Sequence, residues 1–370
     1  MSRHSVILGV PGSRRVERFQ EALSEACLPP AKVLSWLDFL KGASFEDMIR
    51  RGAIVRIESP GDDFETWRMM VALGEGRMSL AEALNMREET GRIRCGAQWY
   101  SGFKYALDRL VEQLDEAPDH LAMCDPTDIA LMFDKRRCQN HFIDADIAVP
   151  PLLPPPADFD ALVEQTASTP RVFLKPRHGS SASGVLAIER GPRAQLQAWT
   201  SVELTDDGAL FNNLRVRKVR DQKTLAAIVN ALIPEGVHLE RWLPKGSLNG
   251  RTVDLRVLCI AGQPRHVVVR SSLTPLTNLH LGNARGNLKD LQREVGREGW
   301  IEVATLCKRA ARTFPRSLHV GLDVALSPGW RSQVVLEANA FGDLLPGVRS
   351  RDEETEVAEI NALLKRARAA

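Results

Sequence analysis

The sequence predicts an α/β protein in which a small N-terminal α/β domain precedes a larger, strand-rich portion. Three observations lead to this prediction. Two buried-strand patterns flank an amphipathic helix within the first 60 residues, as in a β-α-β unit. After residue 170, strand patterns alternate with glycine-containing turns, and two pairs of them are typical of antiparallel hairpins. The chain has 370 residues, which is enough for two or three packed units.

The first predicted domain begins with a strand at residues 5–10, where aliphatic residues follow one another. A helix is expected from Arg14, and a proline pair at 29–30 ends it. Residues 53–59 form the second strand, and residues 64–115 are mostly helical in pattern. The apolar side chains expected on one face of the first helix are Val16, Phe19, Leu23 and Cys27.

The remaining elements follow from the same patterns. Helical spacing predicts a helix over 126–147, and the proline-rich run 150–156 is typical of a stiff turn or linker. A final helix is expected over 352–369, because acidic residues begin it and basic residues end it, as the helix dipole favours. The predicted strands between them are 171–176, 184–190, 214–221, 237–243, 253–262 and 263–272, of which the last two form a hairpin.

The overall composition excludes several classes of protein. Lys and Arg number 49 against 47 Asp and Glu, so a nucleic-acid coat or a membrane-surface protein is not expected. The six cysteines form no C-x-x-C pair, which argues against a zinc or redox site. The chain opens without a signal-peptide pattern and contains no apolar run long enough to span a bilayer. We therefore expect a cytoplasmic protein with reduced thiols and no nucleic-acid or membrane partner.

A candidate phosphate-binding loop lies at residues 173–185, FLKPRHGSSASGV. Lys175 stands on a strand, and glycines and serines follow it before the next strand begins. Small residues let backbone N–H groups approach an anion, and a lysine adds a point charge. A flexible hairpin with a solvated lysine is the equally weighted alternative.

A candidate metal site lies in the hairpin predicted at residues 321–341. Glu337 and Asn339 are two residues apart on a strand, so their side chains share one face about 6–7 Å apart. The hairpin would bring Asp323 beside them. Two carboxylates and an amide suit Mg²⁺, which prefers oxygen ligands. The alternative is a carboxylate–arginine network with Arg256 or Arg270.

The order of these motifs resembles the ATP-grasp superfamily of carboxylate–amine ligases over about residues 126–350. Residues 254–270 and 276–287 look most like the RimK-type glutamate ligases, with Thr277 where that family has serine. The resemblance implies a two-lobed ATP-grasp domain after the N-terminal one. The domain boundaries we expect are 1–115 for the N-terminal domain, 116–245 for the linker and small lobe, and 246–370 for the C-terminal lobe.

The resemblance also implies roles for individual residues. The nucleotide is expected to bind through two phosphate-binding lysines, Lys135 and Lys175. The loop that closes over the triphosphate contains Gly179, Ser180, Ser181, Ser183 and Gly184. The interdomain hinge that holds adenine, partly through backbone groups, consists of Glu240, Arg241, Trp242 and Leu243. Those expected to hold metal are Asp323, Glu337 and Asn339, with Glu337 bridging two ions. Those expected near the transferred phosphate are Arg256, Arg270 and Asn278. The family's ribose-binding acid is missing from residues 244–247, so either Ser247 or Lys245 replaces it or the ribose is held elsewhere.

The implied reaction uses ATP and Mg²⁺, with two ions expected and Mn²⁺ acceptable. A small-molecule or peptide carboxylate would form an acyl phosphate, which an amine then attacks. A catalytically silent nucleotide-binding regulator or scaffold and a small-molecule kinase are the alternatives. The segments 9–15, 56–61 and 98–104, together with Asp343, could line the substrate site or could simply be packed loops and caps. The sequence leaves the oligomeric state open.

Overall fold

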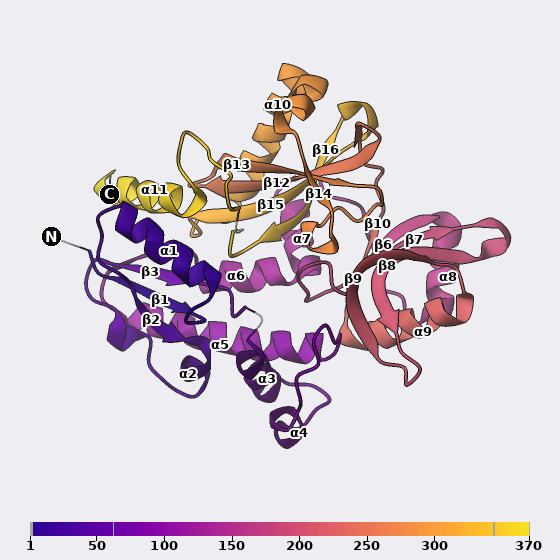
Figure 1. The fold of residues 1–370 in the computed structure, drawn as a ribbon. Coiled ribbons are helices and arrows are strands. Elements are labelled where there is room, and N and C mark those ends of the chain that lie inside the picture. Colours follow the sequence, from indigo (N-terminus) through magenta and orange to yellow (C-terminus); the bar gives the residue numbers. More distant parts are fainter. Residues whose placement is uncertain (1–2, 62, 343–344, 370) are drawn as a thin grey trace.

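The chain folds around three β-sheets in the computed structural model, which describes residues 3–61, 63–342 and 345–369 (Figure 1). The N-terminal sheet lies beside α11 (Thr355–Ala369), so the first and last helices of the chain, α1 (Arg14–Glu25) and α11, pack side by side. The second sheet forms a separate lobe on the far side of the molecule, drawn in magenta and pink, and the third lies between the two in orange and yellow.

The first sheet is parallel and has the strand order β2-β1-β3-β4. Its faces are both covered, as parallel sheets require. Ile7 and Ile54 point toward α1, whereas Val6 and Val55 point toward α5 on the other face. The strands are β1 (Ser5–Gly9), β2 (Lys32–Ser35), β3 (Ala53–Ile57) and β4 (His120–Ala122), and the other helices of this part are α2 (Trp36–Leu40), α3 (Phe64–Leu73), α4 (Leu80–Leu84) and α5 (Gly96–Glu116).

The second sheet is antiparallel and has the strand order β5-β10-β6-β7-β8-β9. Two helices pack on one face through residues such as Leu162 and Ile228, which join a separate apolar core. The other face points toward the third sheet and is available for a site. The elements are β5 (Leu152–Leu153), α8 (Phe159–Ser168), β6 (Arg171–Pro176), β7 (Leu186–Arg190), β8 (Leu196–Leu204), β9 (Leu210–Val219), α9 (Gln222–Leu232) and β10 (Val237–Arg241).

The third sheet is antiparallel and has the strand order β14-β13-β12-β15-β16, with β11 paired to β12. Its strands are β11 (Ser247–Leu248), β12 (Arg251–Ile260), β13 (Gln263–Ser272), β14 (Ala284–Gly286), β15 (His319–Leu326) and β16 (Gln333–Asn339). The helices associated with it are α6 (Pro126–Phe133), α7 (Lys135–Asp144) and α10 (Leu288–Arg312). Short 3-10 turns occur at Glu46–Met48, Pro192–Ala194, Ile233–Glu235, Leu279–Leu281 and Pro328–Trp330.

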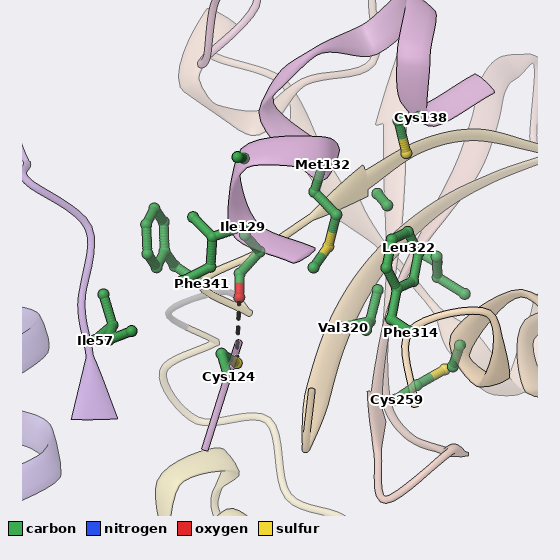
Figure 2. Close-up of a cluster of buried hydrophobic side chains, with 14 of the residues drawn as sticks. Ile57, Cys124, Ile129, Met132, Cys138, Cys259, Phe314, Val320, Leu322 and Phe341 are labelled. Carbon is green, nitrogen blue, oxygen red and sulfur yellow. Dashed lines mark hydrogen bonds between the residues drawn. The ribbon is translucent and has the colours of Figure 1, made fainter. Parts of the chain in front are cut away.

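The largest apolar core joins the N-terminal sheet to the third sheet (Figure 2). Ile129 and Met132 project from α6 into this core, between Cys124 at the end of the first sheet and Val320 on β15. All four side chains are at most 3% exposed. Because α6 is anchored on both sides, α7, which follows it, is held at a fixed position over β16.

Most predicted elements are confirmed, including the hairpin of β12 and β13, and the differences have local causes. The helix predicted over 126–147 is broken at Asp134, whose φ of −94° and ψ of 96° are not helical, so α6 and α7 are separate. The first helix ends at Glu25, and Cys27 is exposed with a positive φ rather than on the buried face. The final helix begins only at Thr355, because Arg351 and Asp352 adopt positive φ.

The proline-rich run contributes one short element. Leu152 and Leu153 form β5, the edge strand beside β10, which agrees with the expectation that this run cannot be a central strand. Among the described residues, no helix combines the length and the apolar character that crossing a membrane requires.

Candidate functional site

The predicted metal residues lie together on the hairpin of β15 and β16. Asp323 is paired directly across the ladder with Glu337, and Gly321 is paired with Asn339. Cross-strand partners share a face, and so do residues two apart on one strand, so the three polar side chains point to the same side. The Nδ2 atom of Asn339 donates to the carbonyl of Gly321 at 3.3 Å, which leaves its Oδ1 atom as an available oxygen donor.

The carboxylate–arginine network that the sequence left as an alternative is also present. Arg256, paired with Asp323 across β12 and β15, places its Nε atom 2.5 Å from Oδ1 of that carboxylate. Arg270 places its Nη1 atom 2.8 Å from Oδ2. Burial alone would lower the pKa of Arg270, but Asp254 and Asp323 outweigh it and raise the pKa. Asp323 is therefore paired with two arginines, and Glu337 is the more accessible carboxylate, with 28% of its side chain exposed.

Lys135, the first residue of α7, faces this hairpin. Its Nζ atom lies 3.3 Å from Oε1 of Glu337 and also donates to the carbonyl oxygen of Gly179 in the glycine–serine loop. The break at Asp134 makes this possible, because it turns the start of α7 toward the loop. One lysine thus connects the candidate metal strand with the candidate phosphate loop.

The glycine–serine loop is firmly held at its base and open at its tip. Arg177 makes a bidentate contact with Asp134 at 2.8 and 2.6 Å, and the ring of His178 stacks on Tyr100 of α5 with centroids 3.9 Å apart. The contact with His178, 3.5 Å away, and the hydrogen bonds from Arg177 overcome the effect of burial and lower the pKa of Asp134. Further along the loop, Ser180 and Ser181 are exposed.

The second lysine, Lys175, lies on β6 and points into the same space. Its Nζ atom is 2.5 Å from Oε1 of Glu240, which lies on β10. Burial would lower the pKa of Lys175, but Glu240 first, and Glu337 after it, raise the pKa above its ordinary value. The two predicted phosphate lysines therefore come from different elements and both lie near Glu337.

The segment predicted to hold adenine lies beside an apolar cluster, and two of its backbone N–H groups already donate hydrogen bonds within the protein. The rings of Phe173 and Trp242 lie 5.4 Å apart within a small apolar cluster between the second sheet and the third. The N–H groups of Arg241 and Trp242 donate to the carbonyls of Pro151 and Arg171, so these two donors are not available to a base. The other members of the cluster are Val185, Ala187, Leu276, Leu281, Ala182, Trp199 and Val216.

The remaining predicted residues of this region are placed by a buried polar network that the sequence did not indicate. Asp254 accepts from Arg270 at 2.7 Å and from Thr277 at 2.5 Å, and its carboxylate lies 2.7 Å from Lys245. Lys245 therefore interacts with the loop at 276–281 and is not available to bind a ribose. Asn278 accepts from the N–H of His280 at 2.9 Å and caps that short turn.

The N-terminal motifs are divided between the interior and the surface. Arg15 donates to the carbonyl of Phe341, just after β16, at 2.9 Å, and lies 3.6 Å from Glu58. Arg15 thus reaches the end of the strand that carries Glu337, and Glu58 lies beside Arg15. Lys104, by contrast, pairs with Asp108 on the surface of α5. Asp343 lies outside the described residues.

A buried thiol and imidazole occur next to this region but cannot act as a nucleophile and base. The Sγ atom of Cys124 lies 3.3 Å from Nε2 of His319, and Nδ1 of His319 lies 3.4 Å from Glu359. Burial raises the pKa of Cys124 to about 12, and burial together with the charge of Arg56 lowers the pKa of His319 to about 3. The thiol therefore stays protonated at neutral pH, and the cluster is structural.

A cavity of about 440 Å³ lies elsewhere, where α5, β4, α6 and α11 meet. None of the predicted site residues lines it. Its lining is mostly apolar, and its Asp125 and Arg316 already pair at 3.2 Å. The convergence of charges near Glu337 therefore identifies the candidate site better than the cavity does.

The donor atoms fit a magnesium nucleotide in kind. Asp323, Glu337 and Asn339 offer oxygen ligands, and Lys135 and Lys175 offer cations for phosphate. Among residues 3–61, 63–342 and 345–369, His, Cys, Asp and Glu side chains form no group of three or more that could hold a metal. The expected ligand set, which includes one amide, does not require such a group.

Comparison with known proteins supports the fold. No model of a known protein family matches the sequence, and no curated protein sequence matches it either. Among solved structures, the chain is similar to D-cycloserine synthetase DcsG, with a TM-score of 0.58 and 14% identity over 98% of this chain and 99% of that one. It is also similar to the ATP-grasp ligase PsnB complexed with a minimal precursor, with a TM-score of 0.55 and 16% identity over 99% of both chains.

A third neighbour is the D-alanine–D-alanine ligase from Bacillus anthracis, with a TM-score of 0.54 and 12% identity over 100% of this chain and 99% of that one. These likenesses extend over nearly the whole length of the chain. The RimK-like character predicted for residues 254–287 stays a prediction. At identities this low, the comparisons define the architecture and not the activity, and they show that the chain has the ATP-grasp fold.

Proposed function

We propose that the chain is an ATP-dependent ligase that activates a carboxylate as an acyl phosphate and joins it to an amine. The observation that carries the proposal is the position of Glu337, which shares its face with Asp323 and Asn339 and lies 3.3 Å from Lys135. The side chains proposed as oxygen ligands and the lysine proposed to bind phosphate thus lie close together in the fold. The structural likeness to ATP-grasp ligases supports the same reaction class.

The chain's own residues would act mainly by position and charge. Lys135 and Lys175 would bind phosphoryl oxygens, and Arg256 and Arg270 would stabilise the negative charge that develops as the carboxylate attacks. The loop that contains Ser180 would cover the reacting groups and keep water out. Magnesium held by the hairpin, with two ions expected and Mn²⁺ acceptable, would supply charge neutralisation on the triphosphate.

The substrate site would lie where the carboxyl ends of β1 and β3 meet the end of β16. Arg15 spans this junction, since it contacts both Glu58 and the carbonyl of Phe341. Carboxyl ends of parallel strands are where α/β sheets bind ligands. Solved neighbours include a complex with a precursor peptide and a ligase for D-alanine, so amino acids and peptides are the substrates to test first. We keep 1–115, 116–245 and 246–370 as the proposed domains.

The proposal is tested by measuring ADP release from the purified chain with ATP and Mg²⁺ against pools of amino acids and peptides. Hydroxylamine in the same assay traps an acyl phosphate as a hydroxamate. We expect substrate-dependent ADP and hydroxamate, and loss of both in Glu337→Gln. Glu164→Gln, at an exposed position on α8, is the matched control and should keep full activity.

The outcomes separate the candidate functions. ADP without hydroxamate would favour a kinase, because phosphate would then leave on a group other than a carboxylate. Nucleotide binding without turnover on any pool would favour a regulatory or scaffold protein. ADP release that persists in Glu337→Gln would contradict the proposed site.

A further inference from the structure

A buried row of three polar side chains crosses two adjacent strands of the second sheet. His238 and Glu240 are two residues apart on β10 and share a face, and His238 is paired across the ladder with Lys175 on β6. Glu240 lies between the other two. Its Oε1 atom is 2.5 Å from Nζ of Lys175, and its Oε2 atom is 3.0 Å from Nε2 of His238.

The three side chains of this row are almost fully buried, and burial restricts the partners that each of them can have. His238 and Glu240 are each 1% exposed, and 13% of the Lys175 side chain reaches solvent. Buried charges are stable only when they are paired and hydrogen-bonded, so loss of Lys175 would leave the charge of Glu240 unmatched, and loss of His238 would leave one of its buried oxygens without a hydrogen bond. Because a carboxylate only accepts, Nε2 of the imidazole carries a proton, and since burial lowers the pKa of His238 despite the nearby Glu240, the ring is a neutral donor. Among the described residues its Nδ1 atom has no hydrogen-bond partner.

The expected role of Glu240 therefore changes. The resemblance placed this residue on adenine, yet both of its oxygens are occupied, one by Lys175 and one by His238. A carboxylate whose two oxygens are both occupied holds the lysine in place and is not available to contact adenine. Lys175 has a flexible four-carbon stem, and without a fixed partner its ammonium group would sample several positions.

We propose that His238 is a positioning residue, which fixes Glu240 so that Glu240 aims the Lys175 ammonium group at the phosphates of the nucleotide. This inference rests on the proposed function, because it needs a nucleotide phosphate for Lys175 to meet. It assigns a role to a residue outside the phosphate loop, the hinge side chains and the metal strands. It also explains why a polar histidine stands at a core position where an apolar residue would pack more simply.

The test compares two amides of different reach at position 238. In His238→Gln the side-chain N–H₂ can stand close to the original Nε2 position and donate to Glu240, whereas in His238→Asn it is too short to do so. The measurement is the Kd of a non-hydrolysable ATP analogue with Mg²⁺, by calorimetry, which does not depend on turnover. We expect His238→Asn to bind about tenfold more weakly or worse, and His238→Gln to stay within about threefold of wild type.

A matched control separates positioning from general stability. His266 is also a buried strand histidine, at 1% exposed, and its Nε2 atom meets the carbonyl of Glu353 at 3.0 Å, on the far end of the third sheet. His266→Asn should lower the melting temperature about as much as His238→Asn but leave the Kd of the nucleotide unchanged. If His238→Asn does not fold, Glu240→Gln replaces it, and a Kd about tenfold higher is again expected.

The possible results decide between the two proposals. Wild-type affinity in His238→Asn, or in Glu240→Gln where that variant is used, would overturn the positioning role, and so would equal losses in His238→Asn and His238→Gln. In either case the proposed ligase would still stand, because the wild-type chain binds the nucleotide. Failure of the wild-type chain itself to bind would overturn the ligase proposal and this inference together.

Discussion

Replacing Asp254 by asparagine should destabilise the chain far more than the same change at a surface aspartate. Asp254 is 0% exposed and is the common partner of Arg270 at 2.7 Å and Lys245 at 2.7 Å. The amide keeps the shape of the carboxylate but removes its charge. Lys245 then loses its carboxylate partner, whereas Arg270 keeps Asp323 at 2.8 Å, and one of the two cations faces an N–H₂ group that cannot accept a hydrogen bond.

The magnitude follows from the cost of an unmatched buried charge. Removing one partner of a buried ion pair costs about 3–5 kcal/mol. With about 2.1 cal/mol/K of unfolding entropy per residue, a chain of 370 residues has about 0.8 kcal/mol/K in total. The expected fall in melting temperature is therefore about 4–6 °C for Asp254→Asn.

The assay is thermal unfolding followed by circular dichroism at pH 7, with Asp119→Asn as control. Asp119 also pairs with an arginine, Arg51, at 2.9 Å, but both side chains are at least 80% exposed. Exposed pairs contribute less than about 1 kcal/mol, so the control should shift by about 1 °C or less. Equal shifts in the two variants would refute the argument that burial, and not pairing itself, sets the cost.

Two further predictions concern the loop and the buried histidine. Gly184→Ala should destabilise the chain by about 1–2 kcal/mol and weaken nucleotide binding, because Gly184 has φ of 73° and a Cβ there would lie 2.5 Å from Cγ of Pro176. Gly191→Ala, with φ of −91° and no contact closer than 3.5 Å, should change the urea midpoint little. For His319, the folded-state pKa of about 3 lies below the unfolded value of about 6.5, so the unfolded state takes up the proton first as pH falls. Stability should thus drop below pH 6.5, by about 2 kcal/mol at pH 5, and urea unfolding at pH 7 and pH 5 should show a smaller drop in His319→Gln.

The elements that sequence patterns predicted well are those whose signal is local. The strands 253–262 and 263–272 match β12 and β13 within two residues at each end, because a tight turn separates two apolar runs. β2 was missed, since its four residues, KVLS, carry no clear alternation, and it lies at the edge of the sheet, where it pairs with β1. The long helix α10 was missed as well, and its left-handed Gly296 interrupts the apolar pattern.

In the candidate site, too, features set by nearby residues could be predicted from the sequence, and contacts between distant residues could not. Alternation along β16 was enough to place Glu337 and Asn339 on one face, and the hairpin register brought Asp323 beside them. The partners of these residues depend on contacts between strands far apart in sequence. Lys245 and Asp254 are close in sequence, but nothing local indicates that both meet Thr277 in the loop that follows β13.

The arginine network around Asp323 also explains why a sequence cannot choose between a metal ligand and an ion-pair partner. Both roles need the same carboxylate on the same strand, and here Asp323 and Glu337 are each matched by a cation of the chain. Lys135 must leave Glu337 before a metal ion can bind there, and a triphosphate gives Lys135 another anion to contact. The geometry therefore favours entry of metal and nucleotide together over tight binding of the metal alone, because only the pair offers every charge in the site a new partner.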